Sequence, residues 1–413
     1  MATSTGTTQE ARYLAAFDAL PNRGKAEPAW LGGLRAAAIA RFRVLGFPVA
    51  RRGNEYWKYT DIGSIARREF IEEPANSAAV GNIPKGVSLV NLNDATGPLI
   101  EAAKAHLGAH AGFEAESFTA LNTALFDDAV LIHVAEGMNV GKVLHIALIS
   151  TESTVAHPRI LIVAEPGSRV SIALSHHGAP GSGYFTNVVT EVAVGEGASV
   201  SLYRFQRERP GSFHVATTAA TVQRDARFES VTLDAGGGLV RHNLNVTLAE
   251  PGASCQINGA YVTDGDQHLD NHTLIEHASA DTSSAELYKG VVDGRSHAVF
   301  MGRVVIPEDA QRTETHQSNK TLLLSSDAKV SSQPMLEIYA DDVTATHGSA
   351  VGQMDPEALF YFKSRGLGED LARSLLVHGF IDEVVSAITD DDVRRRAEDL
   401  IDSALAYGSG RET

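Results

Sequence analysis

The chain has 413 residues, of which 35 are Lys or Arg and 51 are Asp or Glu, so its formal net charge is −16. An acidic chain neutralises phosphates poorly, which argues against a nucleic-acid binder. Its one cysteine, Cys255, excludes a disulfide framework, a cysteine-rich zinc site and a self-contained iron–sulfur cluster.

The first residues lack the charged and then apolar segments of a secretory signal. No run of 18 apolar residues occurs, so we expect no membrane-spanning helix and no membrane partner. These features predict a cytoplasmic protein.

Residues 9–70 have a helical pattern. Five apolar residues recur at spacings of three and four, which places them on one helix face: Leu31, Leu34, Ala38, Phe42 and Leu45. Proline and glycine interrupt residues 71–115, where we expect one strand and one helix at 100–108. The pattern predicts an N-terminal helical domain with a transition segment over residues 1–115.

Short β-branched runs separated by Gly, Asp and Ser begin near residue 129. A turn sequence repeats among them, strongly as VAEGMNV, AEPGSRV, VGEGASV and AEPGASC, and weakly with Asp in place of Gly. Gly and Asp both tolerate turn conformations that other residues resist. The turn residues lie 27 to 30 positions apart: Gly137, Gly167, Gly197, Asp225, Gly252, Asp281 and Asp309.

A period of about thirty residues built from short strands is typical of a solenoid, because each coil must stack on its neighbours to bury its inner face. We therefore predict a mainly β fold, a parallel β-helix over residues 116–345. The alternative is a β-sandwich with coincidental spacing. Cys255 occupies the seventh place of a repeat, where the other strong copies have Val, so we expect it in the core rather than as a reactive thiol.

The helical pattern returns near residue 346 and predicts a C-terminal helical domain over 346–413. Asp355 provides an N-cap, Pro356 the first helical position, and Gly366 a stop. The next apolar face comprises Leu371, Leu375, Ile381, Val384, Val385 and Ile388. We expect the two helical ends to cap the open edges of the solenoid.

Histidines gather in the segment DGDQHLDNHTLIEH, which contains His268, His272 and His277 with interspersed carboxylates. Imidazoles and carboxylates could hold iron or zinc. Spacing in sequence does not fix such a site in a coil, and unrelated histidines are the alternative. His347 stands apart, at the junction between the last strands and the capped helix. A histidine at such a junction can be structural or functional.

Three blocks resemble a known family: GFPVARRGNEYWKYTDI (46–62), ALNTALFDDAVLIHVAEG (120–137) and EIYADDVTATHGSAVGQMDPEALFYFKSRGL (337–367). Together they are similar to the SufD family of the SUF iron–sulfur cluster assembly system, whose paralogue is SufB. The WKYTD sequence favours SufD. The resemblance implies a right-handed parallel β-helix between helical domains, and a scaffold rather than an enzyme.

The resemblance also implies partners, namely SufB and the ATPase SufC, with a nascent cluster assembled between SufB and SufD. This chain has no P-loop of its own, because Gly141-Lys142 lacks the required first glycine. We expect no stably bound cofactor on the lone chain, and only a transient iron–sulfur cluster or iron in the complex.

The family motif at the junction carries a cysteine two residues before its functional histidine. In this chain His347 matches the histidine, and Ala345 replaces the cysteine. The resemblance therefore implies that His347 is the cluster-assembly and metal-binding residue, with thiolates supplied by SufB. It also implies that the C-terminal domain docks SufC, and the residues expected there are Phe360, Tyr361, Arg365 and Gly366; packing of these aromatics on the solenoid is the alternative.

Two other functions compete with the scaffold. Some β-helices act on acidic polysaccharides, but the sequence lacks a secretory signal and an identifiable basic row. A self-associating structural module is the other, because strands at a solenoid end can pair with a second copy. Such pairing could form either a homodimer of the isolated chain or a heterodimer with SufB.

Overall fold

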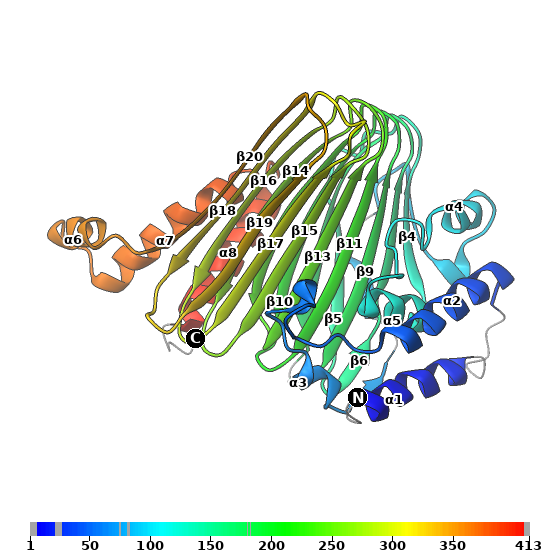
Figure 1. The fold of residues 1–413 in the computed structure, drawn as a ribbon, viewed down its shortest axis with the longest axis horizontal. Coiled ribbons are helices and arrows are strands. Elements are labelled where there is room, and N and C mark those ends of the chain that lie inside the picture. The colour runs from blue at the N-terminus through cyan, green and yellow to red at the C-terminus, as the bar shows by residue number, and fades with distance from the viewer. Residues whose placement is uncertain are drawn as a thin grey trace.

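Two long β-sheets lie face to face along the computed structural model, and helices pack on their outer faces (Figure 1). The structure describes residues 6–20, 27–73, 76–80, 83–179, 181 and 183–408. From β7 onward, successive strands alternate between the sheets, and neighbours within each sheet are parallel. Over the described residues this gives a parallel β-solenoid of eight turns, which confirms the predicted fold class.

Each turn contributes one strand to each sheet. The first sheet contains β3 (Val87–Asn91), β4 (Ala129–Val134), β7 (Arg159–Ala164), β9 (Phe185–Val194), β11 (Phe213–Val222), β13 (Leu239–Leu248), β15 (His268–His277), β17 (His297–Ile306) and β19 (Lys329–Ile338). Two short strands extend it beside β9, namely β1 (Ile71–Glu72) and β6 (Thr154–Ala156). The second sheet contains β2 (Asn76–Val80), β5 (Leu144–Ser150), β8 (Arg169–Gly178), β10 (Ser199–Glu208), β12 (Arg227–Gly236), β14 (Ser254–Thr263), β16 (Ser283–Val292), β18 (Thr313–Leu323) and β20 (Val343–Gln353).

The repeated turn residues stack along one corner of the solenoid. Six of the seven predicted positions adopt positive φ, between 53° and 78°: Gly137, Gly167, Gly197, Asp225, Gly252 and Asp281. The seventh prediction, Asp309, is wrong, because the residue with positive φ in that turn is Arg312 (φ 58°). The connection from Ile306 to Thr313 is longer than its neighbours, which moves the stacked position, and the Arg312 guanidinium pairs with Asp281 in the preceding turn.

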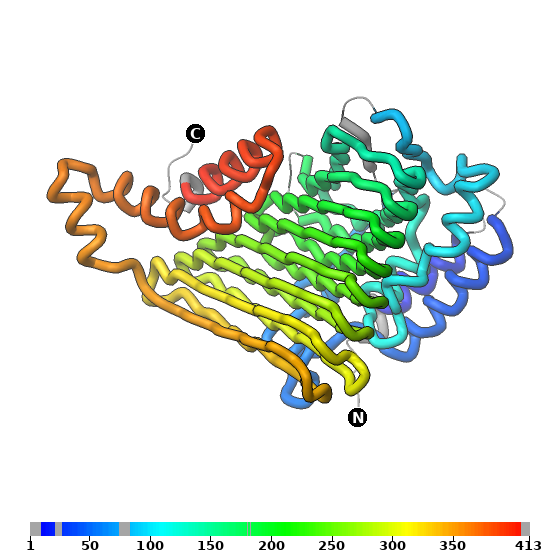
Figure 2. The backbone as a smooth tube through the Cα atoms, turned by 90° about the horizontal axis from the view of Figure 1, so that it is seen from above, coloured from blue at the N-terminus to red at the C-terminus, as the bar shows by residue number. Residues whose placement is uncertain are grey.

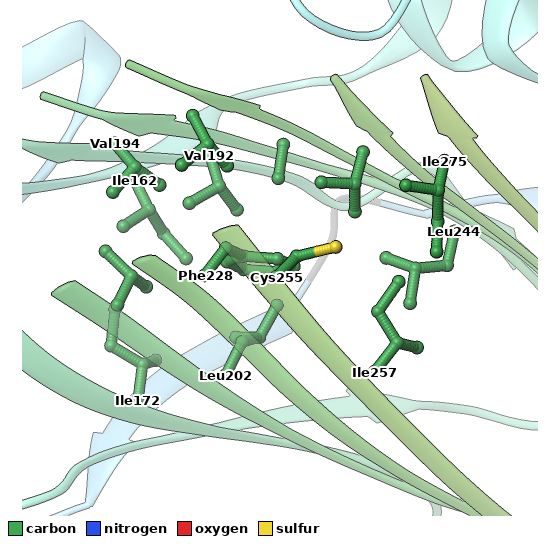
Figure 3. Packing of buried hydrophobic residues seen from close by; sticks show 14 of the residues in the cluster. Ile162, Ile172, Val192, Val194, Leu202, Phe228, Leu244, Cys255, Ile257 and Ile275 are labelled. Atoms are coloured by element: carbon green, nitrogen blue, oxygen red, sulfur yellow. The ribbon is translucent and has the colours of Figure 1, made fainter. Parts of the chain in front are cut away.

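The space between the sheets is the core, filled by alternate residues of each strand. Branched aliphatic side chains from both sheets meet there, among them Ile162, Val192 and Ile257 (Figure 3). Cys255 lies in this cluster with 5% of its surface exposed, as predicted, and burial raises the pKa of its thiol. A protonated, buried thiol is a poor nucleophile.

The N-terminal region covers the outer face of the first sheet with α1 (Gly6–Ala19), α2 (Ala29–Leu45), α3 (Gly63–Ala66), α4 (Pro98–His106) and α5 (Ser117–Leu125), and with the short turns η2 (Glu55–Trp57) and η3 (Leu92–Asp94). Phe42 and Ala38 of the predicted helix face are buried against α5 and its neighbours. The predicted strand and helix of the transition segment are β3 and α4. The segment also contains β1 and β2, which the sequence did not indicate.

The C-terminal region consists of α6 (Pro356–Ser364), α7 (Glu369–Val385) and α8 (Asp391–Gly408). Asp355 caps α6 as predicted, because its side chain accepts a hydrogen bond from the Glu357 amide at 2.9 Å. Helices α7 and α8 pack on the outer face of the second sheet, and do not cover the last strands of the solenoid (Figure 2). The expectation that these helices cap that edge is therefore wrong.

One boundary and one helix face of the C-terminal region also differ from the sequence prediction. Strand β20 continues to Gln353, so the solenoid extends eight residues beyond position 345. Leu371 and Leu375 are 53% and 43% exposed, whereas Ile381 and Val384 of the same predicted face are buried. Within the described residues, no helix is long and apolar enough to cross a membrane.

Candidate functional site

His347 lies in the middle of β20, rather than in a connection between the last strand and α6. It pairs in register with Gln317 of β18, and its side chain is exposed. Alternation along the strand places His347 on the same face as Val343, which packs against the core. The imidazole therefore stands at the open end of the solenoid interior, where it can donate a hydrogen bond or bind a metal ion through a ring nitrogen.

Hydroxyl and amide groups surround this position. The Asn319 amide donates to the Ser332 hydroxyl at 2.8 Å, and the hydroxyls of Ser332 and Ser349 lie 2.7 Å apart, which links β18, β19 and β20. His316 is the nearest histidine in sequence, but it faces the outer side of β18, where its Nδ1 lies 2.8 Å from the Thr346 hydroxyl. Among the described residues, His347 is therefore the imidazole on the inner face of β20, and His316 lies on the outer face.

Strands β19 and β20 are the last members of the two sheets. Within the described chain each pairs with one strand, β17 and β18 respectively, and its other edge is free. No residue of β20 is buried. A long free edge presents unpaired backbone N–H and C=O groups that can pair with another chain.

Helix α6 forms a second exposed surface, beyond the end of the second sheet (Figure 1). Phe360 and Tyr361 are 71% and 56% exposed, so the alternative in which they pack on the solenoid is wrong. The Arg365 guanidinium lies 5.3 Å from the Tyr361 ring centroid, and Gly366 ends the helix with a φ of 88°. Exposed aromatic and arginine side chains are common anchors of protein interfaces.

The exposed leucines of α7, Leu371 and Leu375, extend this surface, and sequence reasoning missed them. Their spacing of four is the same in a buried helix face and in an exposed one. The sequence therefore carried no signal that separates the two cases.

The predicted histidine cluster is divided between two faces of β15. His268 and His272 point outward, whereas His277 points into the core and bonds to Thr282 and Ser284. The alternation of side chains along a strand causes this separation. Among the described residues, no group of three or more His, Cys, Asp or Glu side chains is arranged to hold a metal ion.

The WKYTD block covers a buried charge cluster on the outer face of the first sheet. Asp270 accepts hydrogen bonds from Arg241 and Thr60, each at 2.5 Å, and the His272 Nε2 lies 2.9 Å from its other oxygen. The Arg241 guanidinium stacks 3.8 Å from the Trp57 ring centroid. Burial opposes ionisation of Asp270, but Arg241 and His272 hold its pKa well below the usual range. This block therefore anchors the N-terminal region.

The second block has a similar structural role at α5. Asn122 donates to the carbonyls of Pro158 and Asn187, and its own carbonyl accepts from Arg159 at 3.1 Å. Arg159 pairs at 2.5 Å with buried Glu191. These contacts fix α5 to the first sheet, so only the third block, which contains β20 and α6, supplies exposed candidate residues.

Comparison with known proteins agrees with this architecture. The family model described as SUF system FeS cluster assembly, SufBD core domain, matches residues 147–380, and that of the SufBD protein N-terminal region matches residues 68–146. The first match begins within β5 and ends within α7, so it includes His347 and α6.

Three relatives align over most of their length. An iron–sulfur cluster assembly SufBD family protein of Synechocystis is 30% identical over 81% of this chain and 83% of its own. A protein of the same description from Mycobacterium leprae is 28% identical, covering 91% and 95%. The iron–sulfur cluster assembly protein SufD of Escherichia coli is 27% identical, covering 87% and 90%. The resemblance inferred from the sequence blocks is thus confirmed: the chain belongs to the SufBD family of iron–sulfur cluster assembly proteins.

Proposed function

We propose that this chain is a scaffold subunit that pairs with SufB through β19 and β20, and that His347 supplies a ligand to the nascent cluster at the joint. The single observation that carries the proposal is the free edge of β20 with an exposed imidazole at its middle. Two solenoids joined at such edges would continue each other's sheets. The chain would act in the cytoplasm as a scaffold and not as an enzyme.

The cluster is the cargo of this site, and its ligands would come from both chains. Ala345 precedes His347 by two positions on the same face and offers no thiolate. A cluster with mixed cysteine and histidine ligands is chemically reasonable. The thiolates would therefore come from SufB, and the lone chain would bind the cluster or iron only transiently.

The function of His347 can be tested by co-expressing a His347→Ala variant with SufB and SufC. We expect the complex to form normally but to lose its cluster absorbance, because the imidazole is exposed and supports no packing. His316→Ala is the matched control, since His316 is also exposed but faces the other side of the sheet. Normal cluster yield from His347→Ala, at equal complex recovery, would reject the site.

We further propose that α6 and the start of α7 dock the ATPase SufC. This assignment is supported by the exposed aromatic pair and the adjoining leucines. A Phe360→Ala/Tyr361→Ala double variant should reduce co-purification of SufC by about tenfold or more, because interface aromatics often contribute 2 kcal/mol or more each. Val44→Ala, at an exposed position of α2, is the control. Unchanged SufC recovery would contradict the docking surface.

A homodimer is the second candidate, because the same free edge can pair with another copy. Light scattering of the isolated chain tests for a mass of two chains. Replacement of that dimer by a one-to-one complex with SufB, resolved by native mass spectrometry, would place both partners on one edge. A dimer that persists beside SufB would place them on different surfaces.

A further inference from the structure

A cavity lies between the second half of α8 and the outer face of the second sheet, where β8, β10, β12 and β14 end. We call it the α8 cavity. Its volume is about 380 Å³, which lies within the range of small-molecule sites in proteins. On the helix side, Ser403 and Ala404 follow Leu400 by three and four residues, so all three share one face. The α8 cavity contains no residue of β20 or α6, so it is separate from the surfaces assigned above.

The sheet side of the α8 cavity is a row of outward side chains that are partners across neighbouring strands. His177 of β8 pairs with Arg207 of β10, and Arg207 pairs with Ala235 of β12. Ala235 pairs in turn with Val262 of β14. Ala235 and Val262 pack in one apolar cluster with Leu400 of the helix. The row is therefore polar and basic on one side and apolar on the other.

Two arginines give the basic side its charge. Arg209 follows β10 and lines the cavity together with Arg207, and both side chains are exposed. Neither guanidinium forms an ion pair with a carboxylate of the described residues. The Arg209 Nε donates one long hydrogen bond, at 3.4 Å, to the Gly178 carbonyl. Most of the donors of the two guanidiniums are therefore available to a ligand.

The two carboxylates that line the cavity are directed away from these arginines. Glu208 turns into the solenoid interior, where it accepts a hydrogen bond from the Tyr184 hydroxyl at 2.6 Å and lies 2.9 Å from the His214 Nδ1. An Asp264 oxygen lies beside the next turn, 2.8 Å from the place that a Cβ on Gly294 would take. The α8 cavity thus keeps an uncompensated positive charge, although the chain as a whole has a net charge of −16.

We propose that the α8 cavity binds a small phosphate monoester. The phosphate would lie between Arg207 and Arg209, and the organic group would pack against Ala235, Val262 and Leu400. Guanidinium groups form paired hydrogen bonds with phosphate oxygens, and two of them match the nearly double negative charge of a monoester at neutral pH. Binding here requires neither SufB nor a cluster, so the proposal stands apart from the scaffold function.

Isothermal titration calorimetry of the full chain with phenyl phosphate tests the site, because this probe joins a phosphate to one apolar ring. We expect saturable one-to-one binding that is roughly tenfold or more tighter than binding of inorganic phosphate or benzoate. Inorganic phosphate lacks the apolar group, and benzoate carries a single negative charge. Equal affinity for inorganic phosphate would show that the apolar wall contributes nothing, and equal affinity for benzoate would show that the site does not select phosphate. Either result, or the absence of saturable binding, would overturn the proposal.

Substitutions locate the binding within the cavity. Arg207→Gln removes one guanidinium and Ser403→Phe fills the space beside the helix, so each should weaken phenyl phosphate binding by roughly tenfold or more. Both positions are at least partly exposed, and the thermal unfolding midpoint should therefore stay unchanged.

Arg169→Gln is the matched control for the lost charge. Arg169 is also exposed on β8 and forms no ion pair with a described carboxylate, but it lies eight residues before His177. That separation is about 26 Å along the strand, so this variant should bind phenyl phosphate as the wild type does. Equal weakening by Arg169→Gln and Arg207→Gln would show that the probe responds to net charge alone, which would reject a site at the α8 cavity.

Discussion

The two ends of the solenoid are built from the same repeat but end differently (Figure 2). At the start, β2 lies antiparallel to β5 and β3 lies antiparallel to β4, and helices cover the adjoining faces. At the other end, β19 and β20 leave their outer edges free. Five of the six residues of β4 are buried, whereas none of the eleven in β20 is. The first end also leaves one edge each of β2 and β3 unpaired among the described residues, but these strands have five residues each, against ten in β19 and eleven in β20.

A free edge is a hazard that most proteins block, since it invites pairing with unrelated chains. Here the open end also adjoins buried polar residues of the interior such as Gln317 and Asn319, whereas the first end has an aliphatic core. These differences between the two ends support partner binding at the end formed by β19 and β20. Substitutions at each end test this interpretation.

The largest effect is expected at the anchor of the N-terminal cover. Asp270→Ala would leave Arg241 buried without its carboxylate, and removing one partner of a buried pair costs about 3–5 kcal/mol. We expect the free energy of unfolding, measured by denaturant titration, to fall by that amount. Asp266→Ala breaks an exposed pair with Arg295 and should cost less than about 1 kcal/mol. Equal effects of the two substitutions would show that the cover is not held by the buried cluster.

An intermediate, pH-dependent effect is expected at Glu286, a buried residue of β16. Because the pKa of Glu286 is raised from 4.5 to about 7, the folded state binds this proton more tightly than the unfolded state. Glu286 therefore contributes stability at low pH that is lost as the pH rises from about 4.5 to 7. Glutamine stays neutral, so Glu286→Gln should exceed the wild type in stability by less than about 1 kcal/mol at pH 5 and by about 3 kcal/mol at pH 8.

The comparison of the wild type with the Glu286→Gln variant contains its own control. Glu116 and Glu208 also have pKa values raised to about 7 by burial, but both are present in wild type and variant, so the difference between the two curves isolates Glu286. Parallel stability curves between pH 5 and 8 would contradict a neutral Glu286 in the folded state.

The sequence predicted the solenoid because its turn residues are under a strict local constraint. Gly197 and Asp225 adopt positive φ, which few other residues tolerate, so their spacing marked each coil. Asp309 failed because the stacked position followed the longer connection to Arg312. The exposed surface of α6 and α7 was only partly predictable, because Leu371 and Leu375 have the spacing of a buried face and only packing decides which helix faces are buried. Nor did the sequence indicate that Glu286, Gln317 and His347 are partners in register, because a spacing of about thirty residues does not fix which positions pair.

The smallest effect on stability is expected at the open end, and it gives the sharpest contrast with the first end. Val351 of β20 is 48% exposed, so Val351→Lys should change the free energy of unfolding of the isolated chain by no more than about 0.5 kcal/mol. The same change at Ile132 of β4, which is fully buried, would place a charge in an aliphatic core and should prevent folding. A charged residue on an edge blocks strand pairing, so Val351→Lys should also weaken association with SufB or a second copy. If Val351→Lys pairs as the wild type does in light scattering, the partner binds elsewhere; if it unfolds the isolated chain, the edge belongs to the core and is not an interface.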